Sequence, residues 1–120
     1  MSQKPVLKGA ERRRSVRKDV LETFNVFVVF PKKGLRKLYL KDVSAGGIGV
    51  LTEPSDGFVN GEVVRCDFYI NPSLKLPLAL KVAHVTEVMV GFEFSDTTTK
   101  AHAAFATFID LLDQLSEFVD

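Results

Sequence analysis

The residues best suited to bind an anion lie in a short arginine-rich stretch near the start of the chain. Residues 12 to 17 read Arg-Arg-Arg-Ser-Val-Arg, so that three residues separate Arg13 from Arg17, and Arg12 directly precedes the pair. An arginine side chain can make paired hydrogen bonds to a phosphate, and its planar face can stack on a ring. In an extended segment Arg13 and Arg17 would stand about 13 Å apart, whereas a helical turn would bring them together. The stretch therefore indicates a site for an anionic ligand.

A second short segment places a carboxylate and a hydroxyl beside two glycines. Residues 42 to 47 read Asp-Val-Ser-Ala-Gly-Gly. Ionised Asp42 can only accept hydrogen bonds, whereas Ser44 can donate or accept. Gly46 and Gly47 tolerate positive φ and leave room for a ligand to approach the backbone. The segment is either a shaped floor for a ligand or a tight turn whose Asp and Ser bond their own backbone.

Charge is distributed unevenly along a chain whose formal net charge is +1. Residues 1 to 18 carry seven Lys or Arg residues against Glu11 alone, and residues 93 to 120 carry six acidic residues against Lys100 alone. The basic start has no sustained apolar periodicity, which is typical of a flexible arm. We therefore expect residues 1–18 to form a flexible basic arm that meets an anion, and residues 19–120 to form the folded domain.

Length and residue types exclude several classes of protein. With 120 residues and 46% hydrophobic content, the chain can form one compact domain. Cys66 is the only cysteine, which excludes an intramolecular disulfide and fits a reducing cytoplasm. The longest apolar run, residues 26–30, is far shorter than the roughly 20 residues that cross a bilayer. We therefore expect a cytoplasmic protein without membrane insertion.

The sequence contains no arrangement typical of a catalytic or metal site. Neither His84 nor His102 has an acid or cysteine partner at ligand spacing, so each histidine is expected in a packing or surface role. Cys66 falls on the apolar side of a strand pattern, where a buried, unreactive thiol is expected. Because there is also no nucleophile with a base and no phosphate-binding loop, we expect neither an enzyme nor a cofactor or metal.

The elements that must position these residues are six short strands followed by a helix. Alternation with a period of two, typical of a strand with one solvated face, is clearest over residues 64–70. From about Thr98 to Val119, apolar residues recur at the spacing of an amphipathic helix, with an N-cap expected among residues 95–97. The expected strands cover residues 24–30, 37–41, 48–52, 64–70, 76–86 and 88–94.

Six sequence-adjacent strands with short connections favour an antiparallel sheet that closes into a small barrel, since closure removes exposed strand edges. The terminal helix can then cover an open end or side of this barrel. The expected fold is therefore mainly β, a six-stranded antiparallel β-barrel with a C-terminal α-helix and a flexible N-terminal arm.

The two segments occur in an order and at positions that resemble a known family. Arg13 and Arg17 before the first strand resemble the RxxxR signature of PilZ domains, and Asp42 to Gly47 resembles the D/N-x-S-x-x-G signature. The strand at residues 91–94 and the helix after it resemble the end of the same domain, so the likeness covers roughly residues 11 to 118. Either motif alone would be weak, but both together on this strand pattern are specific.

The resemblance implies a receptor for cyclic di-GMP, a cyclic dinucleotide with two phosphates and two guanines. Arginine donors would reach phosphate or the O6 and N7 acceptors of guanine, and Asp42 would accept from guanine N1 and N2. The arm would fold over the ligand, and this ordering would signal to a downstream protein. Arg12 before the pair resembles the variant that takes up two intercalated ligand molecules. The implied ligand-binding residues are Arg12, Arg13, Arg17, Asp42, Ser44, Gly46 and Gly47.

Two other functions stay open on the sequence alone. The first is a PilZ-like adaptor that binds no nucleotide and works through its helix or barrel wall, although the intact motifs count against it. The second is nucleic-acid binding by the basic arm, which charge alone suggests. The arm has no interleaved aromatic residues, so a nucleic acid polymer is not the expected partner. We expect a monomer or a weak homodimer.

Overall fold

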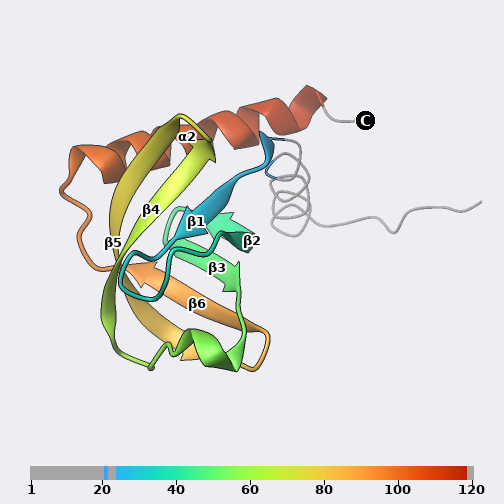
Figure 1. The fold of residues 1–120 in the computed structure, drawn as a ribbon. Helices are drawn as coiled ribbons and strands as arrows, with labels where there is room; N and C mark the ends of the chain where they lie inside the picture. The colour runs from blue at the N-terminus through green and yellow to red at the C-terminus, as the bar shows by residue number, and fades with distance from the viewer. Residues whose placement is uncertain (1–20, 22–23, 119–120) are drawn as a thin grey trace, which may run out of the picture.

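The structure is a computed structural model that describes residue 21 and residues 24 to 118 of the chain. Six strands form one closed antiparallel barrel in the order β1-β2-β3-β6-β5-β4, and a helix follows the last strand (Figure 1). The expected six-stranded barrel with a C-terminal helix is thus confirmed. The strands are β1 (Phe27–Val29), β2 (Leu38–Ser44), β3 (Gly47–Leu51), β4 (Val63–Asn71), β5 (Leu74–Val85) and β6 (Met89–Phe94). The helices are η1 (Pro54–Asp56), α2 (Lys100–Leu115) and η2 (Ser116–Phe118).

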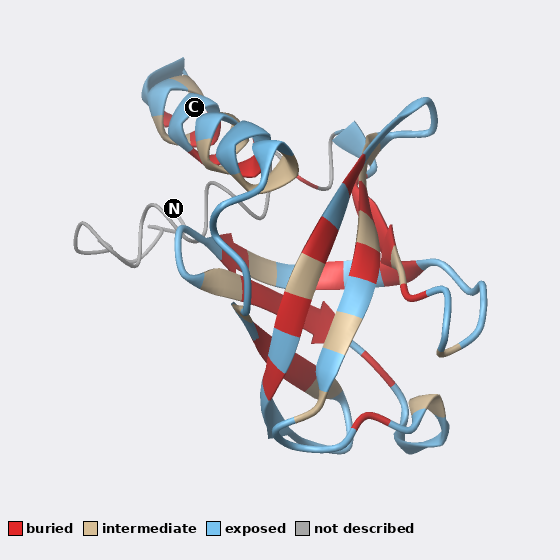
Figure 2. Cartoon of the chain, turned by 90° about the vertical axis from the view of Figure 1, so that its left-hand side faces the viewer, coloured by how far each residue is buried: buried red, intermediate tan, exposed pale blue. Residues whose placement is uncertain are grey.

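The interior of the barrel is filled by the apolar side chains that alternate along the strands. Buried and exposed residues succeed one another along β4 and β5, as the period of two requires (Figure 2). The rings of Phe30, Phe58 and Phe92 form an aromatic cluster with centroids 4.9 to 5.3 Å apart. Each fully buried side chain of this size contributes about 1.5–3 kcal/mol through the area it removes from water.

The C-terminal helix packs on the barrel through one apolar face. Phe105, Ile109 and Leu112 are its buried residues, and the Phe105 ring makes an edge contact with Phe68 of β4 at 5.2 Å. The helix begins later than the sequence suggested, because the N-cap is Thr99 and not one of residues 95–97. The Asp96 carboxylate instead accepts hydrogen bonds from the amide and the hydroxyl of Thr98, in the turn that leads into the helix.

Two of the three register shifts in the barrel are in β2 and β5, the strands on either side of the β3–β6 pair. In β2 the register shifts between Leu40 and Asp42, and in β5 it shifts between Val82 and His84. Leu40 and Val43 are buried, so the two residues between them both lie on the outer face of the barrel. A bulge that re-aims a side chain in this way is a common device beside binding sites. Here the bulge in β2 decides where Asp42 lies.

Candidate ligand-binding site

Four residues on four adjacent strands lie in one row across the outer face of the barrel. Asp42 of β2 is paired with Gly49 of β3, Gly49 with Gly91 of β6, and Gly91 with His84 of β5. The row therefore reads carboxylate, glycine, glycine, imidazole across four strands that are not consecutive in the sequence. We call the pair Gly49 and Gly91 the glycine floor.

The carboxylate and the imidazole lie over the two glycines. A Cβ atom placed on Gly49 would lie 2.7 Å from Oδ1 of Asp42, and one placed on Gly91 would overlap the ring of His84. Directly paired residues on antiparallel strands have Cβ positions about 4.5–5.5 Å apart. The Asp42 carboxylate and the His84 ring therefore cover two residues that have no side chains of their own, and both groups can contact a polar ligand at this face.

The turn between β2 and β3 lies at one end of this floor. Ala45 and Gly46 form a two-residue connection, and the carbonyl of Gly46 accepts a hydrogen bond from the amide of Phe94 at 3.3 Å. Neither Gly46 nor Gly47 uses the positive φ that glycine permits. At Gly47 the requirement is close packing, because a Cβ atom there would overlap the carbonyl oxygen of Phe92. Around Gly46 the space is open, as expected for a position that a ligand approaches.

All four predicted residues of the turn line one open depression of about 440 Å³. Asp42, Ser44, Gly46 and Gly47, the site residues that the sequence predicts in this segment, therefore lie together at one depression. The Ser44 hydroxyl lies 3.4 Å from the carbonyl oxygen of Gly47, a weak contact that leaves the hydroxyl available to a ligand. The other residues that line the depression are Lys41, Ile48, Gly49, Ala83, His84, Met89, Gly91 and Phe92.

Sequence reasoning missed part of this site. The sequence predicts only a packing or surface role for His84 and places Lys41 at the end of the expected strand over residues 37–41. Their place at the depression depends on the pairing of β5 with β6 and on the two bulges, which leave no local signal. The available signal was Gly49 and Gly91, since an isolated glycine inside a strand pattern often marks a close approach of backbone or ligand.

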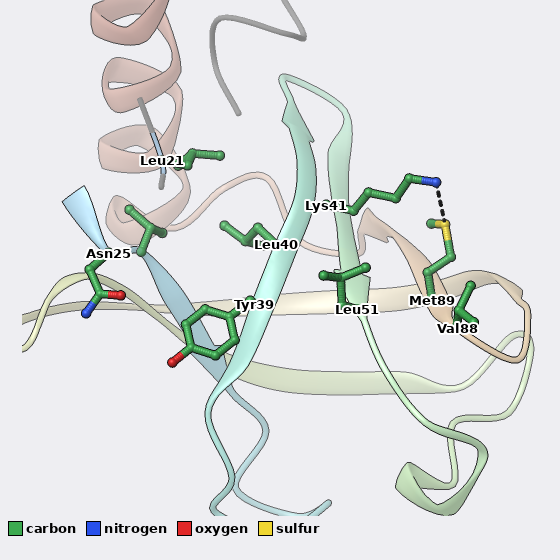
Figure 3. A pocket seen from close by; sticks show the side chains of 9 residues that line it. Leu21, Asn25, Tyr39, Leu40, Lys41, Leu51, Val88 and Met89 are labelled. Atoms are coloured by element: carbon green, nitrogen blue, oxygen red, sulfur yellow. Dashed lines mark hydrogen bonds between the residues drawn. The ribbon is translucent and has the colours of Figure 1, made fainter. Parts of the chain in front are cut away.

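A second, more apolar hollow of about 430 Å³ adjoins the depression (Figure 3). We call it the apolar hollow; the residues that line it are Leu21, Asn25, Val26, Tyr39, Leu40, Lys41, Leu51, Val88 and Met89. Lys41 and Met89 line both spaces, and the Lys41 ammonium donates to the Met89 sulfur at 3.5 Å between them. The two spaces are therefore neighbours separated by one flexible contact.

The arginine motif precedes the described part of the chain. Arg12, Arg13 and Arg17 all lie outside the described residues, as does the whole segment 1–18 that was expected to form an arm. The described chain nevertheless begins beside the site, because Leu21 lines the apolar hollow. Three residues separate Arg17 from Leu21, and an extended segment over this spacing of four positions spans at most about 13–14 Å.

Two other potentially reactive side chains, those of Cys66 and His102, make packing contacts. The thiol of Cys66 is 0% exposed, and burial raises its pKa to about 12, so it stays protonated as expected for a core cysteine. The ring of His102 makes an edge contact with Phe94 at 4.7 Å. Within residues 21 and 24–118, no three His, Cys, Asp or Glu side chains are grouped so that they could hold a metal ion. Among the same residues, no helix is long and apolar enough to cross a membrane.

Comparison with known proteins agrees with this architecture. The family model described as PilZ domain matches residues 11–111. No curated protein matches the chain. Among solved structures, the crystal structure of the uncharacterized Legionella protein Lpg0364 is similar, with a TM-score of 0.58 and 9% sequence identity. The similarity covers 77% of this chain and 89% of the Legionella chain, and at this identity it shows a shared fold.

Proposed function

Because this chain belongs to the PilZ domain family, we propose that it is a receptor for cyclic di-GMP that passes the binding event to a downstream protein. PilZ domains are receptor and adaptor modules and not enzymes, which agrees with the absence of any catalytic grouping from the sequence. The ligand has two guanines joined by two phosphates, so its site must offer acceptors for the guanine donors and cations for the phosphates.

The observation that carries this proposal is the row across β2, β3, β6 and β5. Asp42 faces the floor as an acceptor, and guanine, unlike adenine, has donors at both N1 and N2. Gly49 and Gly91 leave room for the side chains of Asp42 and His84 to lie against the sheet, so that the carboxylate and the exposed imidazole can contact a base that binds over them. A site of this kind rejects adenine because the carboxylate would face acceptors or lose its partners.

In the proposed complex the arginine motif closes over this floor. Arg13 and Arg17 would bind phosphate or the guanine O6 and N7 edge, and Arg12 would extend the site toward two intercalated ligand molecules. The position of Leu21 at the apolar hollow, which adjoins the depression, supports this arrangement because Arg17 lies only four positions before Leu21 in the sequence. Ordering of residues 1–18 on the ligand would then be the signal that a partner protein reads.

Calorimetric titration of the full chain with cyclic di-GMP tests the proposal. We expect micromolar or tighter binding with a stoichiometry of about two ligand molecules per chain, and loss of binding in Arg13→Ala. Arg65→Ala is the matched control, since Arg65 is an exposed arginine of β4 that does not line the depression. Cyclic di-AMP is the ligand control and should bind far more weakly.

The result that would overturn the proposal is the absence of any heat with cyclic di-GMP, with no change in the amide resonances of Asp42 or Gly49. The chain would then be an adaptor that uses the same barrel without nucleotide. Equal weakening by Arg13→Ala and Arg65→Ala would indicate general electrostatic attraction and would also count against a specific site.

A further inference from the structure

Lys41 lies on the same outer face as Asp42, although the two residues are adjacent in the sequence. In a regular strand, neighbouring side chains point to opposite sides of the sheet. The β2 bulge breaks this rule between Leu40 and Asp42, so that a cation and a carboxylate stand side by side at the edge of the glycine floor. The bulge therefore provides a positive charge that regular pairing would have placed elsewhere.

The ammonium of Lys41 has a weak partner. Two other cations of the described chain are held by carboxylates, Lys33 by Glu62 at 2.9 Å and Arg36 by Asp56 at 2.6 Å. Among the residues that the structure describes, Lys41 forms no ion pair, and its one hydrogen bond goes to the Met89 sulfur at 3.5 Å. A thioether is a weak acceptor, so an anionic oxygen would replace it readily.

The position of Lys41 between the two spaces also matters. Its side chain reaches from β2 toward Met89 of β6 (Figure 3). Because both residues line the depression and the apolar hollow, this contact lies at the boundary between the two spaces. Beyond this boundary the hollow offers Tyr39, Leu51 and Val88, which are at least partly exposed and suited to cover the face of a base. A cyclic dinucleotide has its phosphates between its bases, which matches the order of floor, cation and apolar wall.

We propose that Lys41 binds a phosphate of the ligand, and that the apolar hollow receives the base on the far side of that phosphate. This inference rests on the proposed function and adds to it a phosphate contact and a base subsite on the barrel wall itself. Asp42 repels a phosphate that comes near it, and the adjacent ammonium offsets this repulsion. Movement of Lys41 from Met89 to the phosphate also joins the two spaces.

Titration of three Lys41 variants with cyclic di-GMP tests the phosphate contact. Lys41→Ala should bind about tenfold more weakly than the parent chain, since a hydrogen bond to a charged group contributes about 1.5–3 kcal/mol. Lys41→Arg should retain most of the affinity, and Lys41→Glu should lose more than Lys41→Ala. Added salt should weaken Lys41→Ala less than the parent chain, because one ionic contact has been removed. Lys81→Ala is the matched control, because Lys81 is exposed on β5 and lines neither space.

A leucine pair tests the base subsite. Leu51 lines the apolar hollow and is 47% exposed, whereas Leu74 of β5 is 50% exposed and lines neither space. Leu51→Asp should weaken cyclic di-GMP binding about fivefold or more through loss of apolar contact and repulsion of phosphate, and Leu74→Asp should leave it unchanged. Val88→Asp, at a more exposed position of the same hollow, repeats the test if Leu51→Asp lowers the melting temperature.

The outcomes separate this inference from the function on which it rests. If the parent chain does not bind cyclic di-GMP, both fail. If the parent chain binds and Lys41→Ala binds within twofold of it, the phosphate contact is wrong while the receptor function stands. The inference would likewise be overturned if a variant and its control lost equal affinity, as in Lys41→Ala with Lys81→Ala or Leu51→Asp with Leu74→Asp. The loss would then not depend on a position at the two spaces.

Discussion

Two regions of the barrel surface use charged residues in opposite ways. Around η1 and the loop before β2, charges are paired: Arg36 donates to both carboxylate oxygens of Asp56, and Lys33 contacts Glu62. We call these four residues the ion-paired loops. At the glycine floor, Lys41 and Asp42 lie side by side, and neither takes part in an ion pair with another residue of the described chain.

The carboxylates of the ion-paired loops show the effect of this pairing. Partial burial raises the pKa of Asp56, but hydrogen bonds from the Glu53 amide and the Arg36 guanidinium outweigh it and lower the pKa overall. A hydrogen bond from Lys33 is the main cause of the lowered pKa of Glu62. Such charges contribute to folding, whereas the charges at the floor keep their hydrogen-bonding capacity for a ligand. Substitutions should therefore separate into those that change stability and those that change affinity.

The largest loss of stability should come from substitution of Gly47, where β3 packs closely against the backbone of β6. Gly47→Ala puts a Cβ against the carbonyl of Phe92, so β3 and β6 must move apart. We expect a loss of about 3 kcal/mol in the free energy of unfolding. Gly46→Ala, with open space around it and no positive φ, should change stability by less than about 0.5 kcal/mol. Urea unfolding of the two variants measures the difference, and equal stability would show that strand spacing here is not set by Gly47.

Asp42→Ala should be the clearest separation of affinity from stability. It removes the acceptor for guanine N1 and N2, and the donors of the bound base would lose their partner. We expect binding of cyclic di-GMP to weaken about thirtyfold, equivalent to about 2 kcal/mol. The melting temperature of the free protein should change little, because Asp42 is only half-buried and forms no ion pair with the described residues. A large fall in melting temperature with unchanged affinity would show that Asp42 contributes to stability and not to ligand binding.

Asp56→Asn should show the opposite behaviour. It weakens the link between η1 and Arg36 and removes the carboxylate that accepts the Glu53 amide at 2.7 Å. We expect a loss of about 1 kcal/mol in stability at pH 7 and no change in ligand affinity.

The pH dependence of that loss has a definite sign. The folded-state pKa of Asp56 is lowered from its ordinary value of 3.8, so its stabilising contribution is present above about pH 4 and is lost as the pH falls through the folded pKa. Parent chain and Asp56→Asn should therefore converge in stability in strong acid. A difference that persists at low pH would argue against the ion pair as its cause.

His84→Ala should have the smallest effect of the series. The exposed ring covers Gly91 and supplies one wall of the floor, and loss of its contact with a base should weaken binding about fivefold. His84→Phe keeps a ring and should recover most of the affinity, which a role in hydrogen bonding would not allow. Titration of the two variants with cyclic di-GMP decides between stacking and hydrogen bonding.

Local patterns were enough to predict most of the fold. The period of two along the strands and the change to helical spacing near residue 98 come from burial on one side, which the sequence records directly. The sequence places the N-cap among residues 95–97, which is too early, because the side chain of each of these residues can cap a helix. In the structure the Asp96 carboxylate serves the preceding turn, and Thr99 caps the helix through the amide of His102.

The site was only partly predictable, because some of its residues are brought together by strand pairing and not by a local motif. Asp42 to Gly47 is one contiguous segment, so a motif could identify it. His84 and Gly91 meet Asp42 only through the register of four strands and two bulges, and a shift of one residue would turn His84 toward the core. No short segment contains that information. The arginines stay a prediction, because they lie outside the described residues.

Because Cys66 is buried, ligand binding can be followed with a dye attached at another position. Because the one native thiol is sequestered and protonated, a cysteine introduced at an exposed position such as Val88 would be the sole target for a maleimide dye. A fluorophore there would sit at the rim of the apolar hollow without any need to delete the native cysteine. The barrel thus accepts single-site labelling for optical detection of its occupant.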